Sequence, residues 1–231
     1  MDAVTTRKYQ QHRRAKAAEE TRRRVLDAVY EQLRSAPAEP INIDQIARTA
    51  DVARSTVYVA FGSRQGLFDA LGEDLLKRAG FERMLRQSRQ PDARENLRAA
   101  IGELATMYAA ERDVIRALVS MAQLDPGAFS GAIERLERRR AHGMTDLARR
   151  LAEQNQLRRD LDPKAAADTL WLLTSFDAFD LLHTGRRLST PRVAATLTEI
   201  IERAICPNIP AGENDFPTAV TAAGRNESGR P

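Results

Sequence analysis

The absence of strand-like patterning restricts the fold of this chain more than any other feature of its sequence. No run of four to eight residues alternates β-branched and polar side chains, as a half-buried strand would. Ala, Leu, Arg and Glu, which are good helix formers, are abundant instead. Only 12 Gly and 10 Pro interrupt the 231 residues. The sequence therefore predicts an all-α protein.

Composition also excludes several classes of protein. Cys206 is the single cysteine, so a secreted scaffold held by disulfides within the chain is excluded. No long uncharged apolar run could span a membrane. No apolar segment follows the basic N-terminus, as it would in a secretory signal. We therefore expect a soluble, cytoplasmic protein.

Basic residues gather near the N-terminus. Residues 1–24 carry eight Lys or Arg and three Asp or Glu, a net charge of +5, whereas the whole chain carries +4. We expect residues 1–20 to form a basic arm. Such an arm either keeps a protein in solution or follows the phosphates of a nucleic acid, and its position alone leaves both roles open.

Three helices are predicted after the arm, over residues 21–35, 43–50 and 54–61. The second begins with an Asn-x-x-Gln capping box made by Asn42 and Gln45. Asp51 follows it and tolerates the left-handed conformation of a tight turn. The two short helices would be unstable alone, so they must share a small core with the first one. This arrangement is a helix-turn-helix.

The third helix keeps several side chains outside that core. They comprise one arginine, two hydroxyls, a tyrosine and a valine, which suit a helix that enters the major groove. These residues are Arg54, Ser55, Thr56, Tyr58 and Val59.

The same stretch resembles the TetR family of bacterial transcriptional repressors. The motif consists of Ile46-Ala47, Ala50, Val52, Ser55-Thr56, Tyr58, Phe61, Ser63-Arg64 and Leu67. The resemblance implies a homodimer that binds a palindromic operator and is released by a small-molecule ligand. Whether such a regulator represses or activates depends on where its operator lies, so an activator stays open.

On this interpretation the DNA-binding residues divide into three groups. Arg54 is expected to read a base, guanine, while Ser55, Thr56 and Val59 add base-edge or sugar contacts. Phosphates are expected at Tyr58, Ser63 and Arg64. The arm would reach the backbone or the minor groove through Arg13, Arg14 and Lys16.

The sequence departs from the family pattern in three places. Asp51 stands where glycine is usual, and Ala53 replaces the serine that usually caps the recognition helix, a loss that typically costs about 1 kcal/mol. Val59-Ala60 replaces a bulkier pair before Phe61, so we assign no contact to Ala60. These departures keep one alternative open, a helical ligand-sensing or interaction module without sequence-specific DNA binding.

The remaining helices are expected to form a larger domain. They are predicted over residues 67–87, 91–112, 114–124, 129–155, 163–182 and 191–206. The last two have spare apolar surface, which in a symmetric pair would form a four-helix dimer interface. The residues expected at that interface are Leu173, Leu181, Val193, Leu197, Ile200 and Ile201.

The family resemblance also implies a small-molecule pocket within the larger domain. Candidate lining residues are Met107, Tyr108, Met121, Phe129, Met144, Trp171 and Phe176, although each also fits an ordinary core position. Asp177 and His142 are candidate polar anchors. The sequence does not name the ligand.

No enzyme motif is present. The three histidines and Cys206 lie far apart without metal-ligand spacing, and no nucleophile elbow or phosphate-binding loop occurs. We therefore expect neither catalysis, nor a metal, nor a cofactor. The predicted organisation is a basic arm (1–20), a helix-turn-helix head (21–66), a helical ligand-binding and dimerisation domain (67–206) and a disordered tail (207–231).

Overall fold

The chain is all-helical, as predicted. The computed structural model describes residues 3–37, 39–82, 86 and 90–207, and no strand occurs among them. The helices are α1 (Ala3–Ser35), α2 (Ile43–Thr49), α3 (Arg54–Phe61), α4 (Arg64–Arg78), α6 (Ala93–Ala110), α7 (Arg112–Leu124), α8 (Pro126–Glu153), α9 (Pro163–Leu173), α10 (Phe176–Asp180), a π-helical turn η1 (Leu181–Gly185) and α11 (Thr190–Ile205).

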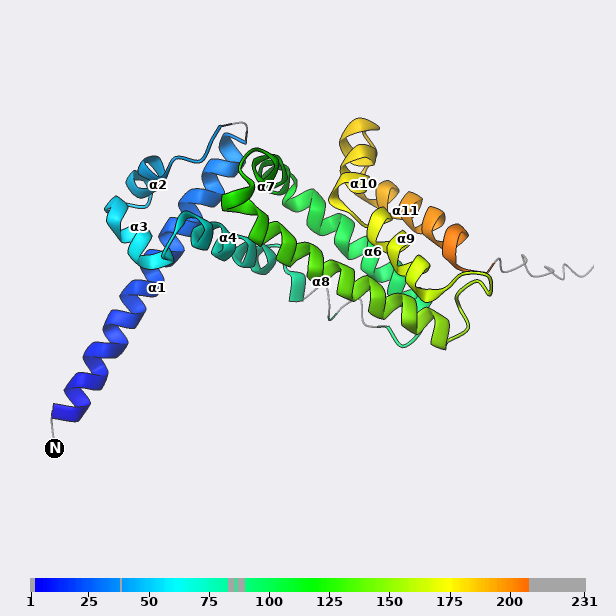
Figure 1. Cartoon of the computed structure of the whole chain (residues 1–231), viewed down its shortest axis with the longest axis horizontal. Coiled ribbons are helices and arrows are strands. Elements are labelled where there is room, and N and C mark those ends of the chain that lie inside the picture. Colours follow the sequence, from blue (N-terminus) through cyan, green and yellow to red (C-terminus); the bar gives the residue numbers. More distant parts are fainter. Residues whose placement is uncertain (1–2, 38, 83–85, 87–89, 208–231) are drawn as a thin grey trace, which may run out of the picture.

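The first helix is much longer than expected. The predicted start at residue 21 is wrong, because α1 is continuous from Ala3 and includes most of the segment expected as an arm. Residues 15–20 are Ala-Lys-Ala-Ala-Glu-Glu, all good helix formers, so nothing there stops the helix. Its N-terminal half projects away from the rest of the molecule (Figure 1). The basic residues of this segment are therefore carried on a helix.

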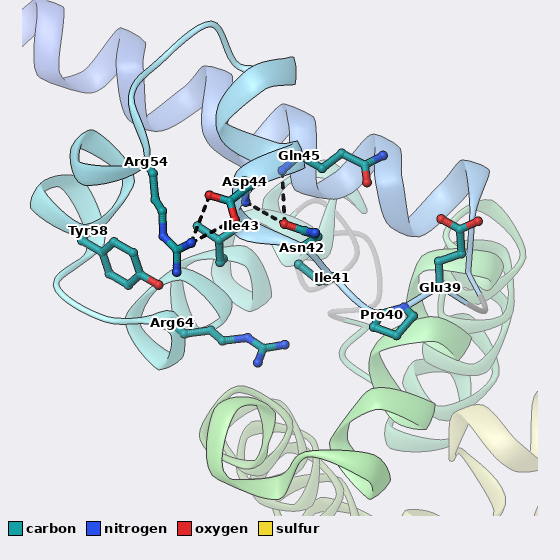
Figure 2. A pocket seen from close by; sticks show the side chains of 10 residues that line it. All are labelled: Glu39, Pro40, Ile41, Asn42, Ile43, Asp44, Gln45, Arg54, Tyr58 and Arg64. Atoms are coloured by element: carbon teal, nitrogen blue, oxygen red, sulfur yellow. Dashed lines mark hydrogen bonds and ion pairs between the residues drawn. The ribbon is translucent and has the colours of Figure 1, made fainter.

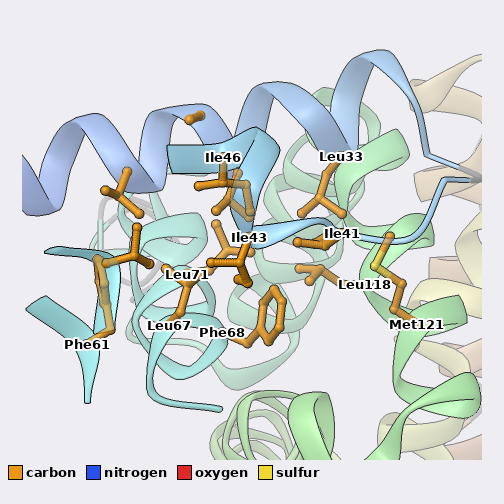
Figure 3. Close-up of a cluster of buried hydrophobic side chains, with 14 of the residues drawn as sticks. Leu33, Ile41, Ile43, Ile46, Phe61, Leu67, Phe68, Leu71, Leu118 and Met121 are labelled. Atoms are coloured by element: carbon orange, nitrogen blue, oxygen red, sulfur yellow. The ribbon is translucent and has the colours of Figure 1, made fainter. Parts of the chain in front are cut away.

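The head, formed by the second half of α1 with α2, α3 and the start of α4, is built around the predicted turn. The Asn42 side chain caps α2 by accepting hydrogen bonds from the backbone N–H groups of Asp44 and Gln45. Asp51 has a φ of 52°, the left-handed conformation that the turn requires. Figure 3 shows the apolar side chains that these helices bury, which include Leu33, Ile46, Phe61, Leu67, Phe68 and Leu71.

Helix α4 connects the head to the larger domain. Ser63 caps it by accepting a hydrogen bond from the backbone N–H of Gly66 at 2.9 Å. The helix ends at Arg78 rather than at the expected residue 87, because Gly80 adopts a φ of 70° and ends the ladder in the left-handed conformation. Gly66 itself is in a tight place, since a Cβ atom there would clash with the carbonyl oxygen of Phe61.

The buried apolar side chains of the described chain form two clusters. The first unites the head with α7 and with Phe129 of α8. The second lies between α6, α8, α9, α10 and α11, and includes Leu97, Leu151, Leu170 and Ile201. Cys206 is part of this second group at 1% exposure, and burial raises the pKa of its thiol. The body helices thus have a core of their own, distinct from the core that they share with the head.

The expected single helix over residues 163–182 is wrong. Asp162 caps α9 and Pro163 begins it as predicted, but the helix ends at Leu173. The Thr174 hydroxyl donates to the carbonyl oxygen of Leu170, and Ser175 caps the separate helix α10. Hydroxyl side chains that bond to nearby backbone in this way compete with the helical ladder.

Two further observations concern the limits of the fold. Among the described helices, none is both long and apolar enough to cross a membrane. The tail predicted as disordered lies, from residue 208 onward, outside the described residues.

Candidate nucleic-acid interface

Helix α3 presents the residues expected to contact DNA. Val57 and Phe61 hold it to the head at 2% and 9% exposure. The opposite side carries Arg54, Ser55 and Tyr58, all exposed, and Val59, which is 86% exposed. Thr56 is half-buried. An apolar side chain as exposed as Val59 is free to meet a thymine methyl group.

Arg54 is held by two neighbours. Its Nη1 donates to both carboxylate oxygens of Asp44, at 3.1 Å and 2.9 Å, and its guanidinium lies 5.9 Å from the centre of the Tyr58 ring (Figure 2). A hydrogen bond with Tyr58, together with the attraction and hydrogen bond of Asp44, raises the pKa of Arg54. The guanidinium therefore stays charged and faces the start of α2.

These side chains line an open cleft of about 600 Å³ between α2 and α3. Figure 2 shows Arg54, Tyr58 and Arg64 on one side of it and the start of α2 with Asp44 on the other. The cleft is wide and exposed, which suits contact with a large polar surface better than enclosure of a small molecule.

Arg64 joins the head to the body. Its Nη1 lies 3.2 Å from Oδ2 of Asp125, at the junction of α7 and α8. Its guanidinium also lies 5.6 Å and 5.9 Å from the ring centres of Phe68 and Phe129. Ser63, next to it, uses its hydroxyl oxygen to cap α4 and retains its O–H as a donor. Both residues thus stand at the beginning of α4, where a helix N-terminus favours anions.

The projecting part of α1 leaves the head beside the end of α3. Arg22 donates a hydrogen bond to the carbonyl oxygen of Ala60, and its guanidinium lies 4.4 Å from the centre of the Phe61 ring. Arg13, Arg14 and Lys16 are exposed on the helix beyond this contact. Their direction is consequently set by the helix and not by a flexible chain.

The residues proposed for a ligand pocket lie in three different places. Met107, Tyr108, Met144 and Phe176 line one cavity of about 180 Å³ in the body. Met121 and Phe129 belong to the core of the head instead. Trp171 is 42% exposed, and its indole N–H donates to Glu137 at 3.1 Å.

The two candidate polar anchors face outward. The His142 side chain is 79% exposed beside Asp146, and Asp177 is paired with Arg116 at 3.2 Å with 67% exposure.

The residues proposed for a dimer interface also separate. Val193, Leu197 and Ile201 are buried within the protomer, and Leu173 is half-buried. Leu181 and Ile200 are exposed, at 70% and 44%. Leu172, which the sequence pattern did not single out, is 62% exposed. The exposed members leave apolar surface on α9, η1 and α11.

Three residues at the interface were missed by sequence reasoning: Asp44, Arg22 and Asp125. Each acts through a partner that is 10 to 61 positions away in the chain, namely Arg54, Ala60 and Arg64. Only the folded chain brings these partners together, within the head for the first two pairs and between head and body for the third, so no local spacing could have indicated them.

Comparison with known proteins identifies the type of head. Residues 25–71 match the family model described as bacterial regulatory proteins, tetR family. The resemblance predicted from the sequence is thereby confirmed for the head, which is a DNA-binding helix-turn-helix of a transcription regulator. No curated protein sequence matches the chain.

Solved structures extend the likeness to most of the fold. NalD of Pseudomonas aeruginosa, the secondary repressor of the MexAB-OprM multidrug efflux pump, is 21% identical with a TM-score of 0.61, over 84% of this chain and all of that chain. FadR of Bacillus subtilis in complex with stearoyl-CoA is 16% identical with a TM-score of 0.61, over 77% of this chain and 96% of that chain. The ketosteroid transcriptional regulator KstR2 of Mycobacterium tuberculosis is 17% identical with a TM-score of 0.58, over 80% of this chain and 95% of that chain. These similarities establish a shared fold with an N-terminal head and a larger helical body.

Proposed function

We propose that this chain, a transcription regulator with a TetR-type head, is a homodimeric repressor that binds a palindromic operator and is released by a small molecule. The observation that carries the proposal is the outward face of α3. It presents Arg54, Tyr58 and Val59 from a head whose other large apolar side chains are buried or half-buried. The proposal is a binding function in the cytoplasm, without catalysis.

Each proposed contact follows from position and chemistry. Arg54 would hydrogen-bond a guanine, with Ser55, Thr56 and Val59 contacting base edges or sugars. Tyr58, Ser63 and Arg64 would contact phosphates at the beginning of α4 and the exposed face of α3.

The basic residues of α1 would add contacts outside the recognition site. An α-helix is about 10–12 Å across and the minor groove only about 6 Å wide. Since Arg13, Arg14 and Lys16 are carried on a helix, the helix itself would stay outside the minor groove, and only their side chains would reach the backbone or the groove.

A homodimer is supported by exposed apolar side chains on the body. Leu172, Leu181 and Ile200 are 62%, 70% and 44% exposed, a pattern that is costly in water unless another surface covers it. A two-fold arrangement through this surface would place two heads side by side. The recognition helices would then lie about 34–36 Å apart, or at a related helical spacing.

An effector site is supported by the apolar cavity of about 180 Å³. Met107, Tyr108 and Phe176 form part of its wall, and Leu75 and Leu76 of α4 form another part. The residues proposed to contact phosphates stand at the beginning of the same helix. A ligand that displaced α4 from the cavity side would therefore also move these residues in the head. A ligand that prefers the state with separated heads would then release DNA by population shift.

The apolar lining also indicates the kind of effector. The similar structures include a regulator bound to stearoyl-CoA and a regulator named for ketosteroids. We infer that the effector of this chain is likewise largely apolar.

Selection from a random duplex DNA library at near-physiological salt tests the proposal, with the Arg54→Ala variant run in parallel. A palindromic sequence that the wild type enriches and the variant does not would support a sequence-specific dimeric regulator. No enrichment from a folded protein supports the alternative, a ligand-sensing module. A monomer mass by sedimentation at micromolar concentration would contradict the homodimer.

A further inference from the structure

Asp44 and Arg54 form an ion pair in the middle of the proposed DNA-binding face. The carboxylate is on the first turn of α2 and the guanidinium is on the first residue of α3, so the pair bridges the two short helices (Figure 2). The two side chains are 48% and 57% exposed. Exposed pairs contribute little to stability, so holding the fold together does not by itself account for an acid at this place.

An acid here also has a cost for DNA binding. A carboxylate near the phosphates is repelled, and it lowers the affinity for DNA of any sequence. Asp44 would be favourable in a complex only where a donor group of a base faces it. In the major groove such a donor is the N4 amino group of cytosine or the N6 amino group of adenine.

The hydrogen bonds of the pair leave groups available for bases. Among the described residues, the hydrogen bonds to the Asp44 carboxylate come from Nη1 of Arg54, at 2.9 Å and 3.1 Å. A guanidinium has five N–H donors, so Nε and Nη2 of Arg54 are not used by Asp44. Each carboxylate oxygen likewise keeps a further lone pair. The pair therefore presents donors and acceptors together at the rim of one cleft.

We propose that Asp44 is a specificity-determining residue that reads G·C pairs together with Arg54. Arg54 donates to O6 and N7 of a guanine, and Asp44 accepts from the N4 amino group of a cytosine in the same or the adjacent base pair. Asp44 also limits the orientations of the Arg54 guanidinium, so the arginine is directed to one base. This inference rests on the proposed function, since it assumes a DNA complex in which α3 occupies the major groove.

The test compares wild-type protein with Asp44→Asn, Asp44→Ala and the matched control Glu39→Gln. Glu39 lines the same cleft and is exposed, and its backbone N–H donates to Ala36, while the carboxylate that pairs with Arg54 among the described residues is that of Asp44. Binding is measured on the selected operator and on duplexes in which each half-site base pair is replaced in turn. Thermal melting confirms that every variant is folded, which is expected because Asp44 is about half exposed.

The expected result separates specificity from charge. Both Asp44 variants should lose about tenfold or more of the preference for G·C at one or two adjacent positions, the value of one good base contact. They should also bind non-specific DNA more tightly, because a negative charge is gone. Glu39→Gln should tighten non-specific binding while the base preference at every position stays as in wild type.

Two other outcomes overturn the inference in distinguishable ways. Asp44 variants that keep the wild-type base preference at all positions would show that Asp44 only makes a surface ion pair, while the proposed function stands. A wild-type protein without any sequence preference would contradict both the inference and the proposed function.

Discussion

The rings of Phe68 and Phe129 stack on each other, with their centres 3.8 Å apart and their planes inclined by 26°. Phe68 belongs to α4 and Phe129 to the first turn of α8, so this stack joins the head to the body. Both side chains are fully buried, at 0% and 2% exposure. Phe129, one of the residues suggested for a ligand pocket, thus packs in the core of the head.

Replacing Phe129 with alanine should destabilise the protein by about 3–5 kcal/mol, because the change leaves a cavity between head and body. Leu124→Ala is the control, since Leu124 is 85% exposed on the neighbouring helix and its truncation removes little buried contact. Chemical denaturation of the two variants measures the difference. Equal stabilities would mean that the stack contributes nothing to folding.

Gly66→Ala should destabilise the head although alanine is the better helix former. The new Cβ atom would meet the carbonyl oxygen of Phe61, so the turn before α4 must shift, at a cost of about 1–3 kcal/mol. Gly102→Ala in α6 has nothing within 4 Å of the new atom and should stabilise the protein by about 0.5–1 kcal/mol. Thermal melts of both variants provide the check, and a change of the same sign would refute the steric argument.

Asp180 should make folding stability depend on pH in the acid range. Burial raises the pKa of this carboxyl, but hydrogen bonds from Arg112, Thr184 and Arg116 outweigh it and lower the pKa to about 2. The charged form is therefore favoured by folding. This preference adds about 2 kcal/mol to the free energy of unfolding. The full amount is present at pH values well above the ordinary pKa of 3.8, and it is lost as the pH falls towards 2.

Asp180→Asn should accordingly be less stable than wild type at neutral pH, and the difference should vanish near pH 2. Asp177→Asn is the matched control, because that carboxylate is 67% exposed on the same helix. Urea denaturation at several pH values distinguishes the two. A constant difference across this range would mean that the charge of Asp180 is not responsible.

Arg54→Ala should weaken operator binding by about 1–3 kcal/mol and relax the preference at one base position in each half-site, since a single base contact is removed. Arg48→Ala, on the exposed side of α2, removes the same charge from another site and serves as the control. Binding assays with operator variants read out the preference. A uniform loss on all sequences would assign Arg54 to a phosphate.

Replacing Arg13, Arg14 and Lys16 together with glutamine should reduce the salt dependence of DNA binding. The slope of log K against log salt is negative, and each phosphate contact that is lost makes it less steep by about 0.9. Lys164→Gln on the body is the control, because it changes a charge far from the head. An unchanged slope in the triple variant would mean that the projecting helix does not contact the backbone.

The order of the helices and the turn between α2 and α3 could be predicted because their causes are local. Turns and helix ends are marked by the side chains at those positions, which are Asn42, Asp51, Ser63 and Pro163. The spacing of apolar residues predicts the helices between them. The extra length of α1 was also encoded locally, by residues that favour a helix. High charge alone does not indicate a loose arm where the residues that carry it favour a helix.

The parts of the site that could not be predicted depend on tertiary contacts. Asp44 meets Arg54 only after the two short helices fold against α1. Val193 and Ile201 have the same spacing whether they face a neighbouring helix or a second protomer, so the pattern could not show that they are buried within one chain. Periodicity identifies an apolar face but not what covers it.

The burial of Cys206 makes this protein convenient for spectroscopy. A thiol at 1% exposure, whose pKa burial has raised, has little thiolate and little access to reagents. It is also the only cysteine in the chain. A cysteine introduced at an exposed position of the head, such as Val59, would therefore be the one site that takes a spin label or dye. In a two-fold assembly, the distance between two such labels would report directly how far apart the recognition helices lie.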